Sequence, residues 1–100
     1  MRVRYSKTAL LTLEVIIDFL KIRWTDKEID KLRIDIELFE QTMQNQIITH
    51  QSLASHPDIK FALIGNKQVR IYYKKVDNDI NIIAFFATKS NPEKIEKLLR

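Results

Sequence analysis

Two consecutive stretches of helical periodicity, separated by a very short connection, constrain the fold of this chain more than any other feature. Each has apolar residues at the three- and four-residue spacing of an amphipathic helix. Thr25 and Glu28 have the spacing of a capping box, so the second helix begins near Asp26. With only about three or four non-helical residues between them, helices near 7–23 and 26–45 form an antiparallel hairpin. The stripes are Ala9, Leu10, Leu13, Ile16, Ile17 and Leu20, then Ile29, Leu32, Ile36, Phe39 and Met43.

The second half of the chain is typical of β-strands. Residues 60–64 and 69–74 are strand-like, the latter with strict alternation, and Gly65-Asn66 supplies a turn between them. Residues 80–87 are nearly all apolar, which predicts a central strand covered on both faces. A short strand at 3–5 precedes the first helix, and Asn91-Pro92-Glu93 begins a terminal helix.

The predicted order is therefore β-α-α-β-β-β-α. This is an α+β fold in which the helical hairpin packs on a twisted antiparallel sheet, and 100 residues form a single domain spanning 1–100. The predicted core includes Leu13, Ile17, Leu32, Ile36, Phe39, Ile71 and Ile82.

Composition excludes several function classes. The absence of cysteine excludes disulfide scaffolds, thiol nucleophiles and thiolate zinc sites. Glu14 and Asp18 interrupt the apolar run near the N-terminus, so we expect neither a signal peptide nor a membrane span, and a soluble, cytoplasmic protein. His50 and His56 lack a third ligand at metal spacing, so we expect them in a surface loop, with no metal and no cofactor.

Positive charge is concentrated in the second half of the chain. Residues 1–50 are neutral overall, and residues 51–100 carry the whole net charge of +4. No acid occurs between Ile59 and Val76, a stretch that holds Lys60, Lys67, Arg70, Lys74 and Lys75. Such a patch suggests a polyanionic or acidic partner, with a solvated strand face as the alternative.

These segments, in this order, resemble the RelE/ParE superfamily of bacterial type II toxins, also known as plasmid-stabilisation proteins. The matching residues are Tyr5-Ser6-Lys7 with Ala9, Trp24, Ala62-Leu63-Ile64-Gly65, Val69-Arg70-Ile71-Tyr72-Tyr73, Asp79-Ile80 with Ile82, and Asn91-Pro92-Glu93-Lys94. The resemblance implies a small α+β toxin that is neutralised by an antitoxin protein encoded by an adjacent gene.

The resemblance implies two targets. RelE-like members are mRNA interferases, which cut messenger RNA on the ribosome with cationic side chains and without a metal. Their chemistry requires a deprotonated ribose 2′-hydroxyl, stabilised negative charge on the phosphate and a protonated leaving oxygen. ParE-like members instead poison DNA gyrase, and a third possibility is a non-toxic homologue that only binds its antitoxin.

The resemblance carries over to few residues. Arg70 matches the strand arginine of the nucleases, whereas the places of their paired lysines fall near Phe61 and Leu63. Lys89 keeps the charge of a family arginine without its bidentate fork. The nuclease set is thus incomplete, and an ion pair between Arg70 and Asp79 is the structural alternative. The expected residues are Arg70, Lys67 and Lys89 for catalysis; Lys60, Lys67, Arg70, Lys74 and Lys89 for nucleic-acid binding; and Leu11, Phe19 and Arg70 for antitoxin binding.

Overall fold

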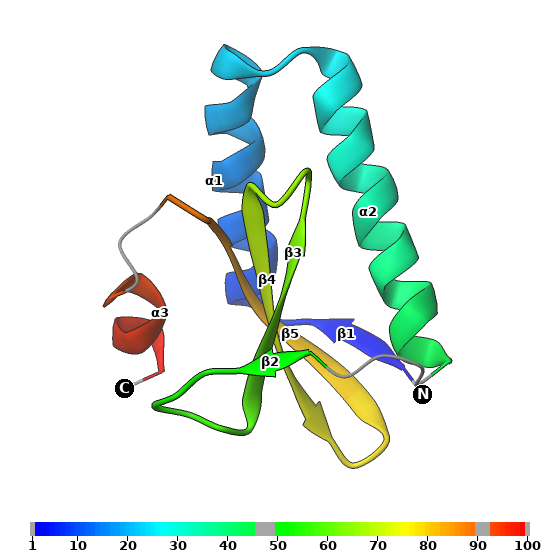
Figure 1. Ribbon diagram of the computed structural model, residues 1–100, viewed down its shortest axis with the longest axis vertical. Coiled ribbons are helices and arrows are strands. Elements are labelled where there is room, and N and C mark those ends of the chain that lie inside the picture. The colour runs from blue at the N-terminus through cyan, green and yellow to red at the C-terminus, as the bar shows by residue number, and fades with distance from the viewer. Residues whose placement is uncertain (1, 46–49, 90–92, 100) are drawn as a thin grey trace.

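The computed structural model describes residues 2–45, 50–89 and 93–99 of the chain, whose path is shown in Figure 1. The predicted bounds of both long helices hold to within one residue. The elements are β1 (Val3–Tyr5), α1 (Lys7–Arg23), α2 (Asp26–Gln44), β2 (Gln51–Ser52), β3 (Ile59–Ile64), β4 (Val69–Val76), β5 (Asp79–Ala87) and α3 (Glu93–Leu98).

The strands form one five-stranded sheet in the order β1-β5-β4-β3-β2. The predicted helical hairpin on a sheet is confirmed, with two refinements. First, β1 runs parallel to β5, so the sheet is mixed rather than wholly antiparallel. Second, Gln51 and Ser52 add a short strand within the segment predicted as a connection. Neither feature is visible in the sequence, because a strand's residue pattern does not report the direction of its neighbour.

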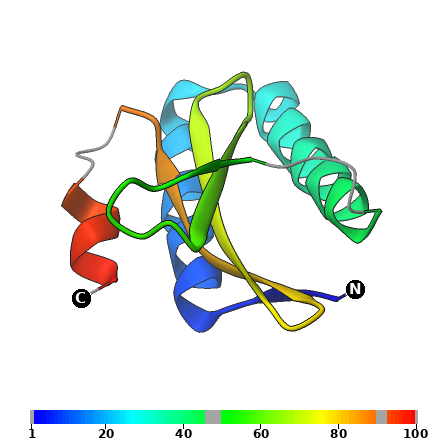
Figure 2. The same cartoon turned by 60° about the horizontal axis from the view of Figure 1, so that its bottom comes forward.

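The sheet is covered on both faces. Helices α1 and α2 pack on one face, around a core that includes Leu32, Ile71, Ile82 and Phe85. On the other face Ile95 of α3 packs in a smaller cluster with Ile59, Tyr72 and Ala84. Figures 1 and 2 show α3 standing apart from the hairpin, on the other side of the strands. This double covering explains why β5 is apolar along nearly its whole length.

A β-bulge in β5 determines which side chains reach each face. Tyr72 lies opposite Ala84 and Tyr73 opposite Ile82, so Ile83 is an extra residue. Two side chains near the start of α1 form hydrogen bonds with backbone groups of β5 around the bulge. The Ser6 hydroxyl donates to the carbonyl of Ile83 at 3.0 Å, and the Phe85 N–H donates to Thr12 Oγ1 at 3.0 Å. Helix α1 is thereby anchored to the bulge.

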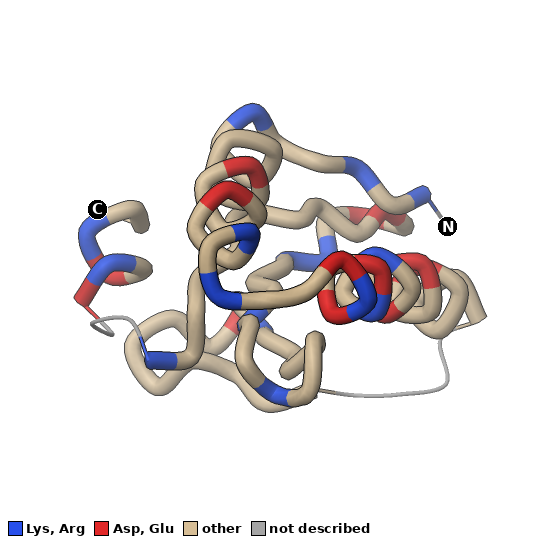
Figure 3. The backbone as a smooth tube through the Cα atoms, turned by 90° about the horizontal axis from the view of Figure 1, so that it is seen from above, with Lys and Arg blue, Asp and Glu red and all other residues tan. Residues whose placement is uncertain are grey.

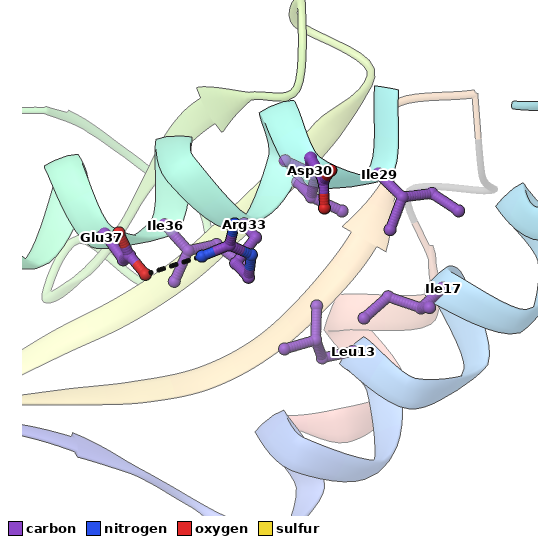
Figure 4. A pocket seen from close by; sticks show the side chains of 8 residues that line it. Leu13, Ile17, Ile29, Asp30, Arg33, Ile36 and Glu37 are labelled. Carbon is purple, nitrogen blue, oxygen red and sulfur yellow. Dashed lines mark hydrogen bonds and ion pairs between the residues drawn. The ribbon is translucent and has the colours of Figure 1, made fainter. Parts of the chain in front are cut away.

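The hairpin is more open than the sequence predicts. Leu13, Ile17 and Ile36 are only partly buried, whereas the other predicted core residues are buried. The two helices diverge from their connection, as Figure 1 shows, and leave a cleft of about 250 Å³ between them. Figure 4 shows Leu13 and Ile17 of α1 facing this cleft, with Ile29 on the α2 side.

Gly65 joins the β3–β4 turn to α2. The predicted turn at Gly65-Asn66 is present, with Gly65 in the left-handed region at a φ of 59° and Asn66 and Lys67 at φ values of 56° and 66°. The Gly65 N–H donates to Asp35 Oδ2 at 2.8 Å, and a Cβ at this position would lie 3.2 Å from Leu32 Cδ1. The turn is therefore held closely against α2.

The C-terminal helix is present, with Ile95 buried, Leu99 partly buried and Leu98 exposed. The predicted capping residues Asn91 and Pro92 lie outside the described residues. None of the helices in the described part of the chain has the length and apolar character needed to cross a membrane.

Replacing Leu32, which is 1% exposed, tests the packing of α2 on the sheet. We expect Leu32→Ala to lower the free energy of unfolding by about 2–5 kcal/mol, because the site lies between α2 and the β3–β4 turn. The matched control is Leu38→Ala on the exposed side of α2, expected to cost less than about 0.5 kcal/mol. Urea unfolding measures both; equal losses would contradict this packing.

Candidate functional site

Arg70 lies on the sheet face that the helical hairpin leaves uncovered. Val69, Ile71 and Tyr73 point into the core beneath the hairpin, so alternation directs Arg70 to the opposite face, as predicted. Its cross-strand neighbours are Leu63 on β3 and Phe86 on β5.

The Arg70 guanidinium contacts aromatic side chains and, among residues 2–45, 50–89 and 93–99, forms no ion pair with a carboxylate. Its Cζ lies 5.0 Å from the centroid of the Phe61 ring, a cation–π contact. Nη1 donates to the Tyr72 hydroxyl at 3.4 Å, while Nε is buried and has no hydrogen-bond partner in the described part of the chain. A buried donor without a partner costs free energy. The guanidinium therefore carries a positive charge that no carboxylate among the described residues offsets.

The alternative ion pair between Arg70 and Asp79 does not form. Asp79 forms its ion pair with Arg4, whose Nε lies 3.2 Å from Asp79 Oδ2, and it also accepts from the Arg2 N–H at 3.3 Å. Asp79 lies opposite Val76, at the other end of β4 from Arg70. The pairing of β1 with β5 brings Arg4 to Asp79, and the sequence pattern does not reveal that pairing.

Lys67 and Lys89 lie together at one end of the sheet. Lys67 is in the β3–β4 turn, and its carbonyl accepts from the Thr88 hydroxyl at 2.7 Å, which ties the turn to the end of β5. Both lysines line a groove of about 650 Å³ between α1 and the C-terminal end of β5, which we call the α1–β5 groove. Arg70 is not among the residues that line it, so the three predicted catalytic residues do not all meet in one pocket.

The α1–β5 groove also contains two of the three predicted antitoxin contacts, and the third, Arg70, lies outside it. Leu11 and Phe19 line it, and their side chains are 52% and 48% exposed. The guanidinium of Arg23 lies over the Phe19 ring, with Cζ 4.9 Å from its centroid. The groove therefore joins an exposed apolar face of α1 to a cluster of cations.

The remaining predicted RNA-binding residues lie on different faces. Lys74 is on the face of Arg70, where its Nζ lies 3.1 Å from Asp58 Oδ2 and lowers the pKa of that carboxyl by hydrogen bonding. Lys60 lies opposite Tyr73, on the hairpin side of β3. Lys60 is thus separated by the sheet from Arg70.

Lys60 lies beside a small aromatic cluster that includes His50. The Nδ1 atom of His50 and the Tyr73 hydroxyl are 2.6 Å apart, and both rings pack against Phe39. Burial, and secondly the positive charge of Lys60, lower the pKa of His50 below its ordinary value of 6.5. Burial raises the pKa of Tyr73 to about 12. His50 is therefore a packed residue at the margin of the core rather than a free loop residue.

Two residues that lie near Arg70 are not singled out by the sequence pattern. Tyr72 follows Arg70 by two positions and shares its face, a relation that strand alternation alone reveals. Phe61 is the cross-strand partner of Tyr72, which only the register shows.

The distribution of charged side chains and of possible metal ligands limits the chemistry that this site can perform. Figure 3 shows the acidic residues mostly on the helices, whereas β3 and β4 themselves contain none. Across the described ranges 2–45, 50–89 and 93–99, no group of three or more His, Asp or Glu side chains is placed to hold a metal ion.

Comparison with solved structures identifies the fold. A chain of the chromosomal ParDE toxin–antitoxin system of P. aeruginosa superposes with a TM-score of 0.66 at 15% identity, covering 89% of this chain and 97% of that chain. The isolated RelE toxin of E. coli superposes with a TM-score of 0.54 at 14% identity, covering 99% of this chain and 96% of that chain. No protein-family model and no curated protein sequence matches this chain.

Removing the Arg70 side chain tests whether it is structural. We expect Arg70→Ala to lower the free energy of unfolding by about 1 kcal/mol or less, because the cation–π contact it removes is small and a buried unpaired donor disappears with it. Urea unfolding with circular dichroism measures the change. A loss above about 3 kcal/mol, the size expected for breaking a buried ion pair, would contradict this view of Arg70.

The position of Lys60 has its own test. We expect Lys60→Gln to raise the pKa of His50 toward 6.5, because a neighbouring positive charge is removed while burial remains. NMR titration of the imidazole measures this, with Lys74→Gln on the other face as the control. The pKa of His50 is lower in the folded state than in the unfolded chain, so the free energy of unfolding falls as the pH drops through 6.5. Lys60→Gln should reduce that fall. An unchanged His50 titration would contradict the placement of Lys60.

Proposed function

We propose, from its RelE/ParE fold, that this chain is the toxin of a bacterial type II toxin–antitoxin module that inhibits translation by metal-independent cleavage of mRNA on the ribosome. The fold is shared with the RelE toxin of E. coli and with a chain of the ParDE toxin–antitoxin system of P. aeruginosa. The proposal includes a neutralising antitoxin protein as the natural partner.

The observation that carries the proposal is the state of Arg70. Its guanidinium lies on the sheet face away from the hairpin, has no ion pair among the described residues, and has a buried Nε without an acceptor. An arginine retains its positive charge at every physiological pH and presents a planar set of donors that matches phosphate. The maintenance of this charge without a carboxylate supports a phosphate-binding role.

The chemistry assigned to this site is transesterification of RNA. The ribose 2′-oxygen attacks the adjacent phosphorus, a cyclic phosphate forms, and the bond to the 5′-oxygen of the next nucleotide breaks. Arg70 stabilises the negative charge that develops on the phosphate, and this positive charge also favours loss of the 2′-hydroxyl proton to solvent. Lys67 and Lys89, at the end of the same sheet, bind the RNA backbone, and water supplies the proton to the leaving oxygen.

One observation favours gyrase as a second candidate target. Lys67 and Lys89 line the α1–β5 groove beside exposed apolar residues rather than beside Arg70. Such a mixed surface suits contact with a protein. In that case toxicity depends on the groove and is independent of Arg70.

Induced expression in growing bacteria tests the function. We expect growth arrest with protein synthesis failing before DNA supercoiling changes, as followed by amino-acid incorporation and plasmid topoisomer analysis. Early loss of supercoiling would favour the gyrase alternative, and unimpaired growth would contradict a toxin.

Arg70→Ala tests the site. In a purified translation system we expect ribosome-dependent mRNA cleavage to fall by about 10²–10³-fold, the usual cost of losing one charge-stabilising donor. The matched control is Arg33→Ala, which removes an exposed arginine of α2 that pairs with Glu37. A folded Arg70→Ala protein that cleaves normally would rule out the proposed site.

A further inference from the structure

We propose that residues 50–53, which we call the β2 clasp, detach from the edge of β3 when His50 gains a proton. The clasp contains β2, the outermost strand of the sheet beside β3 (Figure 1). None of its residues lines the α1–β5 groove. The proposal concerns a pH-sensitive switch in the fold itself, and it stands whether or not the chain is a toxin.

The backbone of the clasp contributes little to its attachment. Gln51 and Ser52 pair with β3, and both are exposed. One further bond runs from the Leu53 N–H to the Ile59 carbonyl at 2.9 Å. A ladder this short is marginal without side-chain packing, because ordering the segment costs conformational entropy. The side chains at the two ends of the clasp therefore hold it in place.

The two ends pack on opposite faces of the sheet. On the hairpin face the His50 ring packs against Phe39, with 5.8 Å between ring centroids, and edge-on against Tyr73 at 5.5 Å. On the other face Leu53 packs against the cluster that contains Tyr72 and Ile95. The clasp thus wraps around the edge of the sheet, and its attachment to the hairpin face depends on the titratable side chain of His50.

The contact between His50 and Tyr73 suits a neutral imidazole. Nδ1 lies 2.6 Å from the Tyr73 hydroxyl, and Tyr73 is only 2% exposed. Burial raises the pKa of Tyr73 to about 12, and a backbone hydrogen bond from His50 opposes that rise. Since the Tyr73 oxygen accepts from the backbone, its proton is donated to Nδ1, which accepts only while it is unprotonated. Protonation makes Nδ1 a donor and leaves the buried hydroxyl proton without an acceptor.

Among the described residues, His50 has positive and neutral neighbours but no acidic partner. Lys60 on β3 is positive, and Tyr73 on β4 is neutral. On α2 the acid next to Phe39 in sequence, Glu40, accepts instead from the Tyr5 hydroxyl. Within residues 2–45, 50–89 and 93–99, no carboxylate forms an ion pair with His50. A positive charge on His50 is therefore uncompensated while the clasp is closed.

Acid favours the released clasp. Burial, and secondly Lys60, lower the pKa of His50 in the closed clasp below 6.5, the ordinary value that a released side chain regains. The closed clasp is fully favoured above pH 6.5, and it loses stability as the pH falls through 6.5 toward the lower pKa. Release frees the Leu53 N–H and the outer edge of β3.

Native-state hydrogen exchange of the full chain, followed by NMR, tests the proposal. The reporter is the Leu53 amide, and the reference is the Phe85 amide of β5, which is bound to Thr12. Rates are corrected for the intrinsic pH dependence of exchange. They are measured in low concentrations of urea, because the effect of urea scales with the surface that an opening exposes.

Two variants and a matched control accompany the experiment. His50→Asn keeps an acceptor, since Oδ1 takes the place of Nδ1, but it does not titrate. Lys60→Gln removes the neighbouring positive charge. The control is His56→Asn, which changes the other histidine of the chain, whose Nδ1 lies 3.7 Å from Glu96 Oε2.

We expect the protection of the Leu53 amide to fall about fivefold or more between about pH 7.5 and 5.0, with little dependence on urea. The Phe85 amide should stay better protected at both pH values and should depend steeply on urea. The fall at Leu53 should disappear in His50→Asn, shrink in Lys60→Gln and persist in His56→Asn.

Three results would overturn the proposal. They are Leu53 protection that does not change with pH, a fall that persists in His50→Asn or is undiminished in Lys60→Gln, and a urea dependence of Leu53 at pH 5.0 as steep as that of Phe85. The last result would mean that the whole domain unfolds instead of the clasp detaching. If His50→Asn does not fold, the comparison of Lys60→Gln with the unsubstituted chain decides the question.

Discussion

The attachment of α1 to the bulge in β5 is the constraint on which the other features depend. An extra residue at Ile83 leaves backbone groups of β5 without β4 partners. The Ser6 hydroxyl forms two hydrogen bonds. It donates to the Ile83 carbonyl, and it accepts from the Ala9 N–H, which caps α1. Thr12 Oγ1 accepts from the Phe85 N–H one and a half turns later. Each bond contributes about 1 kcal/mol, and together they fix the helix along the strand.

The bulge also divides the chemistry of the molecule between two surfaces. It lets Ile82 and Phe85, three positions apart, both face the hairpin, while Ala84 faces the other side with Tyr72. Arg70 belongs to that second side, and Lys67 and Lys89 belong to the groove beside α1. Arg70 can therefore be altered by substitution without changing the residues that line the α1–β5 groove.

Much of the fold is predictable from local pattern. The capping box at Thr25, the turn at Gly65 and the alternation through Arg70 depend on neighbours in sequence, and all three appear as expected. Predictions that depended on residues far apart in the sequence were less accurate. Lys60 was grouped with Arg70 by charge although strand register places them on opposite faces. The alternative ion pair between Asp79 and Arg70 does not form, because β1 brings Arg4 to Asp79.

The sequence by itself determined the helices, the turns, the order of the elements and the face on which Arg70 lies. These follow from hydrogen bonding and burial within a few residues of chain, and residue spacing records them directly. Only the tertiary structure decided the parallel pairing of β1, the divergence of α1 from α2 and the cations that gather in the α1–β5 groove. Those features depend on residues far apart in sequence, whose contacts are set by the bulge in β5 and by the packing of α1 upon it.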